Sequence, residues 1–174
     1  MRPSSLISAV EDVLNQGRAL LEGIGSEDYT REEDGPYAAP LGGHYRHILD
    51  HFLCLIEGLQ VGEINYDLRA RNRELETSVE AALAATDNLI AQFRRLPADI
   101  FRQECTVVYS VGYGDGEAQA VRSFVAREIM FCVGHAIHHY AILKLLCAGR
   151  TVRLPYEFGI APSTLKHVEA QAAS

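Results

Sequence analysis

Apolar residues recur at intervals of three and four in four long stretches of this chain, and polar segments rich in glycine or proline separate the stretches. This spacing predicts amphipathic helices. The segment Ser26–Pro40 carries prolines and charges and is predicted to be a loop, and Gly62–Asp67 is predicted to be a connection. Three of the predicted helices lie near residues 4–22, 41–58 and 123–148; the third in chain order follows the Gly62–Asp67 connection, has Leu75 as its first inward residue and ends before Pro97.

The pattern changes between the third and fourth predicted helices. Thr106–Val111 is rich in β-branched and aromatic side chains, which favours a strand. A glycine-rich turn at 112–116 and a return strand at Ala118–Val121 complete a predicted β-hairpin. Ser123 is a suitable cap for the fourth helix, and Ser163 for a short terminal helix.

Four long helices of similar length indicate an all-α fold, a four-helix bundle with a short β-hairpin between the third and fourth helices. The long excursion that holds the hairpin argues against a simple up-down-up-down order. A chain of 174 residues, 48% of them hydrophobic, is sufficient for one domain with a sizeable core. We expect a single domain over 1–174, with the bundle core at about 4–149 and a C-terminal extension at 150–174.

Charge and cysteine content exclude several classes of protein. The formal net charge is −7 and the pI about 5.5, and basic residues cluster only at Arg69, Arg71 and Arg73, so nucleic-acid binding is not expected. No apolar run approaches the ~18 residues of a membrane span, and the N-terminus does not resemble a signal peptide, so we expect no membrane association. The four isolated cysteines are typical of reduced thiols and predict a cytoplasmic protein.

Six of the seven histidines lie in two clusters, and each cluster falls inside an apolar predicted helix. On the second helix His47 and His51 are four residues apart, and on the fourth helix so are His135 and His139. Residues four apart share a helix face, so each pair lies on a face that should be buried. Buried imidazoles need partners, and two facing pairs would be satisfied by a transition metal between them.

Zinc and nickel fit a cluster of imidazoles best. The candidate ligands are His47, His51, His135 and His139. Three histidines plus water would make an open site of catalytic type, whereas four would make a closed, structural site. A metal-free bundle with a small-molecule pocket, in which the facing histidines pair through water, is a third interpretation.

Three residues near the clusters are candidates for supporting roles, and two of them have alternative interpretations. Glu128 lies two turns before His135 on the same face, so it is a candidate general base or hydrogen-bond acceptor for a ligand histidine. A buried ion pair with an arginine is the alternative for Glu128. His138 is expected to be a hydrogen-bonded neighbour or a dimer contact, and His44 is expected to lie at the margin of the metal site.

Two short motifs in the same order, His47-Ile48-Leu49-Asp50 and His135-x-x-His138-His139, resemble the DinB/YfiT-like family of metalloenzymes, which is distinct from the DNA polymerase of similar name. The resemblance covers roughly Leu6 to Ala148. It implies an up-down-down-up four-helix bundle, often a homodimer. It also implies a divalent metal held by His47, His135 and His139, with His51 as a candidate fourth ligand that is not general in the family. Family members of known activity mostly depend on a low-molecular-weight thiol and include a maleylpyruvate isomerase and a thiol S-transferase.

The leading hypothesis is therefore a metal-dependent enzyme of transferase or hydrolase type that acts on a small-molecule substrate, with thiol dependence implied by the resemblance. The alternative is a non-catalytic metal-binding or scaffold bundle. A homodimer is expected from the resemblance and from apolar residues of the fourth helix that lie partly off its core stripe, namely Val133, Ile137, Tyr140 and Leu145.

Arg69 and Arg71 are candidates for binding an anionic cofactor or substrate. With Arg73 they precede the third helix, where positive charge opposes the helix dipole, so a compensating anion is expected. A carboxylate-bearing ligand is one source of that anion. The alternative is that the arginines pair with the acidic side chains of Glu27–Asp34 or with a partner subunit.

Overall fold

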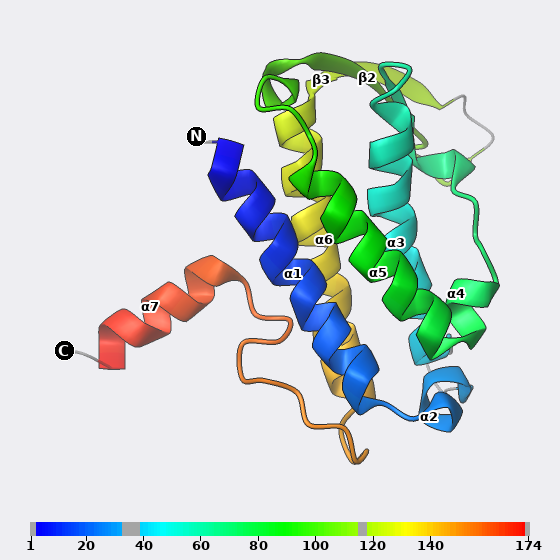
Figure 1. Ribbon diagram of the computed structural model, residues 1–174, viewed down its shortest axis with the longest axis vertical. Helices are drawn as coiled ribbons and strands as arrows, with labels where there is room; N and C mark the ends of the chain where they lie inside the picture. The colour runs from blue at the N-terminus through cyan, green and yellow to red at the C-terminus, as the bar shows by residue number, and fades with distance from the viewer. Residues whose placement is uncertain (1–2, 33–38, 115–117, 173–174) are drawn as a thin grey trace.

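The computed structural model describes residues 3–32, 39–114 and 118–172. Four long helices surround one core (Figure 1): α1 (Pro3–Gly23), α3 (Leu41–Gly58), α5 (Val79–Arg94) and α6 (Val125–Leu146). Each packs against two others, in the cyclic order α1, α5, α3, α6. In Figure 1, α1 and α6 run in one direction, and α3 and α5 run in the other.

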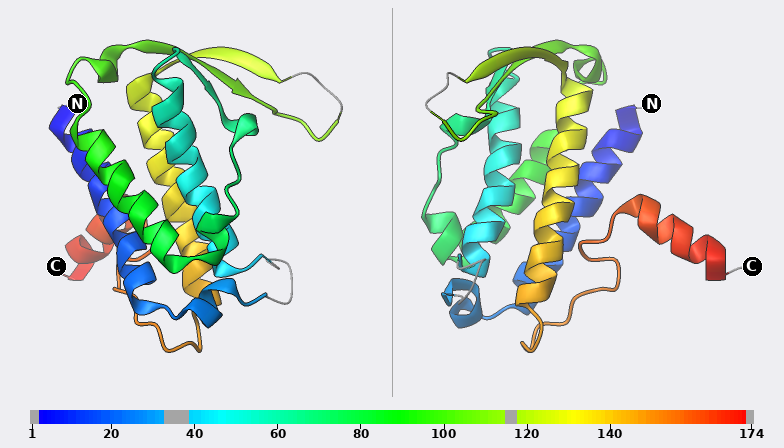
Figure 2. Two further views of the ribbon diagram at one scale, coloured as in Figure 1. Left: turned by 45° about the vertical axis from the view of Figure 1, so that its right-hand side comes forward. Right: turned by 180° about the vertical axis from the view of Figure 1, so that it is seen from behind.

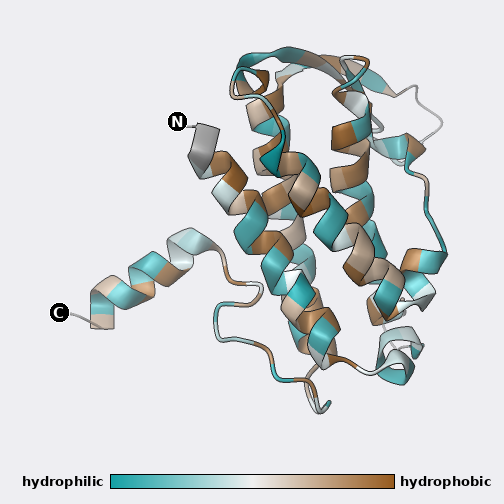
Figure 3. Ribbon diagram, viewed as in Figure 1, coloured by the Kyte–Doolittle hydropathy of each residue, from teal (hydrophilic) through white to brown (hydrophobic). Residues whose placement is uncertain are grey.

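The core forms where the apolar stripes of these helices meet. Hydrophobic and hydrophilic residues alternate along α1, α3 and α5 in Figure 3, as expected for helices with one buried face. The fully buried side chains include Leu14, Ile48, Phe52, Leu89, Phe93 and Ile129. The predicted helical class is therefore confirmed, and the structure adds elements that the sequence pattern did not reveal.

A small mixed sheet covers one end of the bundle (Figure 2). The predicted hairpin is present as β2 (Glu104–Tyr109) and β3 (Gln119–Phe124), which pair antiparallel; residues 115–117 of its predicted turn lie outside the described residues. A third strand, β1 (Glu63–Asn65), pairs in parallel with β2, and Tyr66–Leu68 forms a 3₁₀ turn after it. The prediction of a plain connection at Gly62–Asp67 was therefore wrong, and the fold is mainly helical rather than purely α.

Short helices change two features of the prediction and confirm a third. The predicted loop after α1 contains α2 (Ser26–Thr30), while its residues 33–38 lie outside the described part of the chain. The third predicted helix is divided into α4 (Glu74–Thr77) and α5, because Ser78 is extended (φ −124°, ψ 118°) and its hydroxyl accepts a hydrogen bond from the Ala81 amide as an N-cap. The predicted terminal helix is present as α7 (Pro162–Ala172), which projects from the bundle in Figure 2. Among the residues described, the remaining regular element is the 3₁₀ turn Ile100–Arg102.

Helix α6 is apolar on more than its core face. By length and composition it could cross a membrane, a test that core helices also pass; here it packs against α1 and α3. Outside the core, Met130 is 51% exposed and Leu145 71% exposed, whereas Tyr140 is fully buried. Tyr140 is therefore a core residue and not part of the apolar surface predicted for a dimer contact.

Gly42 gives a direct test of the packing between α3 and α4. A Cβ at Gly42 would overlap the backbone carbonyl oxygen of Glu76, whereas a Cβ at Gly43 would make only ordinary contacts at 3.5 Å or more. We expect Gly42→Ala to destabilise the protein by about 2 kcal/mol or more, because backbone must move. The matched variant Gly43→Ala should stabilise it by ~0.5–1 kcal/mol through helix propensity. Urea unfolding of both variants checks this, and similar midpoints would contradict it.

Candidate metal centre

Three half-buried histidines from two antiparallel helices of the bundle converge on one point. α3 contributes His47, and α6 contributes His135 and His139, which are four residues apart and therefore share a face. Each offers a ring nitrogen, and these atoms all lie within 4.8 Å of one another. Nε2 of His47 and Nε2 of His135 are 3.0 Å apart. We call these three residues the histidine triad.

The triad is neutral at physiological pH. Burial is the largest cause that lowers the pKa of each imidazole, and the neighbouring histidines lower it further. The pKa falls to about 2 for His47, about 4 for His135 and about 3 for His139. Neutral imidazole nitrogens are the form that binds Zn²⁺ and similar ions.

A divalent transition metal fits this donor set. Nδ1 of His139 is buried and has no hydrogen-bond partner within the part of the chain that the structure describes. An unpaired buried nitrogen is costly, and a bound metal ion would satisfy it. Zinc–nitrogen bonds of about 2.0–2.1 Å are compatible with ligand atoms that are already this close. The residues present could therefore hold a metal ion.

His51 lies beside the triad without belonging to it. Its ring centroid is 4.0 Å from that of His135 and 4.6 Å from that of His47. Nδ1 of His51 donates a hydrogen bond to the His47 carbonyl oxygen at 2.8 Å, which leaves the lone pair on Nε2. Burial lowers the pKa of His51 to about 4, so it too is neutral. Its predicted role as a fourth ligand stays a prediction.

The other two clustered histidines lie at the margin. The ring of His44 is 5.7 Å from that of His139, and the ring of the exposed His138 is 5.3 Å from it. Neither belongs to the triad.

Glu128 lies on α6 towards the sheet rather than among the triad. Its carboxylate is buried and accepts hydrogen bonds from the Tyr66 hydroxyl at 3.0 Å and the Ser123 hydroxyl at 2.6 Å. An Arg127 nitrogen is 3.9 Å away, so the ion pair is a loose one. Ser123 binds this side chain, and Phe124 is the N-cap of α6, so the predicted capping role of Ser123 was wrong.

Tyr66 connects Glu128 to the histidines, and the sequence analysis missed it. Its ring stacks on His51 with centroids 5.5 Å apart, and it is 5.1 Å from the Phe131 ring. Phe131 in turn stacks on His135 at 5.7 Å. Burial raises the pKa of the Tyr66 hydroxyl, which therefore remains a donor to Glu128. No local pattern around Tyr66 indicates this role, since Glu128 and Phe131 lie more than 60 positions later in the chain and His51 lies on the preceding helix.

The predicted anion-binding arginines differ in position. Arg69 is half-buried; it donates to the Tyr66 carbonyl oxygen, and its charge helps to lower the pKa values of His47, His51 and His135. Its Nε is buried without a hydrogen-bond partner among the described residues. Arg71 is exposed, with a φ of 50°. Arg69 therefore places positive charge beside the triad, while Arg71 lies farther out on the surface.

The cysteines do not supply a nucleophile here. All four are free thiols, and Cys105, Cys132 and Cys147 are buried. Cys132 contacts Tyr66 and the backbone of His51, and burial raises its pKa to about 12. It therefore remains a protonated core thiol.

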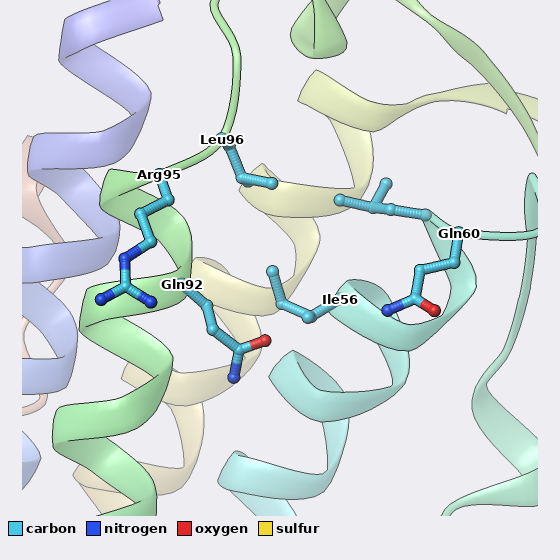
Figure 4. A pocket seen from close by; sticks show the side chains of 6 residues that line it. Ile56, Gln60, Gln92, Arg95 and Leu96 are labelled. Atoms are coloured by element: carbon cyan, nitrogen blue, oxygen red, sulfur yellow. The ribbon is translucent and has the colours of Figure 1, made fainter.

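The described residues line several surface cavities, three of which bear on the site or serve as a comparison. One of about 260 Å³ lies between the ends of α3 and α5, where Figure 4 shows Ile56, Gln60, Gln92, Arg95 and Leu96 around it. The other two adjoin the site and share the side chains of Arg127 and Phe131. The hairpin cavity, about 440 Å³, is lined by Tyr66, Val107, Tyr109, Val111, Val121, Arg122, Ser123, Arg127, Glu128 and Phe131. The histidine cavity, about 370 Å³, is lined by Arg127, Met130, Phe131, Gly134 and His135.

The structure is thus a helical bundle with a candidate metal site between two of its helices. Comparison with known proteins identifies the fold. The chain resembles the crystal structure of a DinB-like protein (YjoA) from Bacillus subtilis, with a TM-score of 0.66 and 17% identity over 88% of this chain and 98% of that one. The chain therefore has the DinB-like fold, as its histidine motifs predicted. No protein-family model matches it. A curated relative, FK506-binding protein 5 of Rhizopus delemar, is 32% identical over 111 residues; these are 62% of this chain and 28% of the relative's length.

Proposed function

We propose that the protein is a metal-dependent enzyme of transferase or hydrolase type, with its divalent metal, zinc or nickel, held by His47, His135 and His139. The observation that carries the proposal is the convergence of three neutral imidazoles from two helices within 4.8 Å. A metal bound there supplies a nucleophile at neutral pH by acidifying a water molecule or a low-molecular-weight thiol. Three protein ligands leave a coordination position for the substrate.

The chain's own residues prepare the surroundings for this chemistry. The ring of Tyr66 stacks on His51 and the ring of Phe131 stacks on His135, so aromatic side chains flank the histidines on the side of the sheet. Glu128 is our candidate general base, and its hydrogen bonds to Tyr66 and Ser123 fix its position. The charge of Arg69, beside the triad, favours an anionic substrate or cofactor, and the exposed Arg71 is a second candidate for contact with that anion.

Cobalt substitution tests whether the metal site is open. We expect Co²⁺-loaded protein to change its visible spectrum when azide is added, because azide can enter the free coordination position. The His51→Ala variant should behave like the wild type. If His51 were a fourth ligand, the wild type would not respond and His51→Ala would. That result would favour the alternative function, a metal-binding or scaffold bundle without catalysis.

We also propose a cytoplasmic homodimer that buries the outer face of α6. The support is the apolar surplus there, namely Met130 and Leu145 together with the half-buried Val133 and Ile137.

Light scattering is expected to give twice the chain mass of 19.2 kDa. The double variant Ile137→Glu/Leu145→Glu should be a monomer, because it places two charges in each half of the contact. Leu68→Glu, at a residue 78% exposed elsewhere, is the matched control and should stay dimeric. A wild-type mass of one chain at micromolar concentration would reject the dimer.

A further inference from the structure

The hairpin cavity has an apolar wall that faces α6. In the antiparallel register Val107 pairs with Val121, and Tyr109 lies two residues along β2 on the same face as Val107. Tyr109 is 42% exposed and Val121 55% exposed, so this wall is open to a ligand. A volume of about 440 Å³ lies in the range of small-molecule sites, ~300–1,000 Å³.

The hairpin cavity continues to the histidine triad. It shares Arg127 and Phe131 with the histidine cavity, whose lining also includes His135. The Phe131 ring lies against His135 with centroids 5.7 Å apart. A ligand lying across Phe131 would therefore contact the hairpin at one end and reach the candidate metal at the other.

The charges along this path favour an anion at its middle. Both oxygens of Glu128 already accept hydrogen bonds, from Tyr66 and Ser123, so the buried acid needs no donor from a ligand. The Arg127 guanidinium stands where the two cavities meet, 5.8 Å from the centre of the Phe131 ring, and its side chain is 61% exposed. An arginine in this position can bind a carboxylate while the ring beneath it contacts the apolar part of the same ligand.

We propose that the two cavities form one binding site for a small aromatic or branched aliphatic carboxylate. Its apolar part packs on Val107, Tyr109 and Val121, and its carboxylate lies beside Arg127 and towards His135. As the substrate class of the enzyme proposed above, this inference rests on that function.

Calorimetric titration with 2-naphthoate, and with the uncharged 2-naphthamide, tests the site. We expect both probes to bind. Val121→Arg should weaken both by at least about tenfold, because it places a charge against the apolar wall. Arg127→Gln should weaken 2-naphthoate by about fivefold, as expected for a rim charge, and leave 2-naphthamide unchanged.

Matched controls separate this site from general surface effects. Val61→Arg, at a valine 78% exposed that lines neither cavity, should bind both probes like the wild type. Leu59→Arg, in the cavity of Figure 4, should do so as well. If Val121→Arg does not fold, Val111→Arg replaces it, since Val111 lines the hairpin cavity and is 77% exposed.

Zinc content, measured on the same samples, distinguishes the two proposals. Zinc uptake without binding of either probe would overturn the carboxylate site and leave the metal enzyme standing. Binding equally tight in Val121→Arg and Val61→Arg would also overturn it. If the protein takes up no zinc but binds the probes, and Val121→Arg weakens that binding, the carboxylate site is supported and the proposal of a metal-dependent enzyme is rejected.

Discussion

Replacing His135 or His139 with alanine is expected to abolish stoichiometric metal binding. The wild-type protein should bind about one divalent ion per chain, because each of His47, His135 and His139 supplies one of three converging ring nitrogens. Loss of one of three ligands should weaken binding by more than about 100-fold, since even outer hydrogen-bond partners of ligands account for 10–100-fold. Elemental analysis of protein purified without a histidine tag measures the stoichiometry, and circular dichroism should show little loss of helix.

Two other histidines provide the controls for this experiment. His138 is exposed and adjacent to His139, and His167 lies on the exposed α7. Alanine at either position should leave the metal content unchanged. Undiminished stoichiometry in both His135→Ala and His139→Ala would reject the triad as the metal site.

Much of the bundle could be predicted because its signals are local. Helix α3 has the predicted bounds, with Pro40 immediately before it and an unbroken apolar stripe that includes Ile48 and Leu55. The histidine triad could be predicted for the same reason, since the i,i+4 spacing of His135 and His139 puts both on one face of α6.

The missed features depend on contacts between distant residues. Strand β1 is three residues long and has no strand pattern of its own; it forms because its backbone pairs with β2, more than 40 positions later. Ser78 lies inside a continuous helical pattern in the sequence. In the structure it adopts an extended, N-capping conformation instead of a helical one, and no local pattern predicted this. The contact between Glu128 and Tyr66 could not be predicted either, because Tyr66 lies in the connection before α4, 62 positions earlier in the chain.

Acid is expected to unfold the metal-free protein at a clearly higher pH than protonation of its carboxylates alone would require. The folded pKa values are about 2 for His47, about 3 for His139 and about 4 for His51 and His135, against ~6.5 in the unfolded chain. Below pH ~6.5 the unfolded state therefore binds more protons than the folded state, and stability falls as pH falls. The contribution of these histidines is complete above pH ~6.5 and is lost progressively towards the folded pKa values.

The size of the effect follows from the number of protons. Each histidine adds at most ~1.4 kcal/mol per pH unit, less for the three triad residues that are only half-buried. Four such groups can remove several kcal/mol between pH 6.5 and 5, a large part of a typical stability of ~5–15 kcal/mol. We expect urea midpoints of the metal-free protein to fall steeply over this interval. Zinc should shift the fall to lower pH, because it binds the neutral imidazoles of the folded chain.

The triple variant His47→Ala/His135→Ala/His139→Ala identifies the groups responsible. It removes three of the four imidazoles whose pKa values are lowered by burial, so its urea midpoint should change much less between pH 6.5 and 5 than that of the wild type. His167→Ala, at an exposed position on α7, should keep the wild-type slope. A triple variant as sensitive to acid as the wild type would mean that groups other than the triad control the transition, and that these imidazoles are not buried in the folded protein as the structure has them.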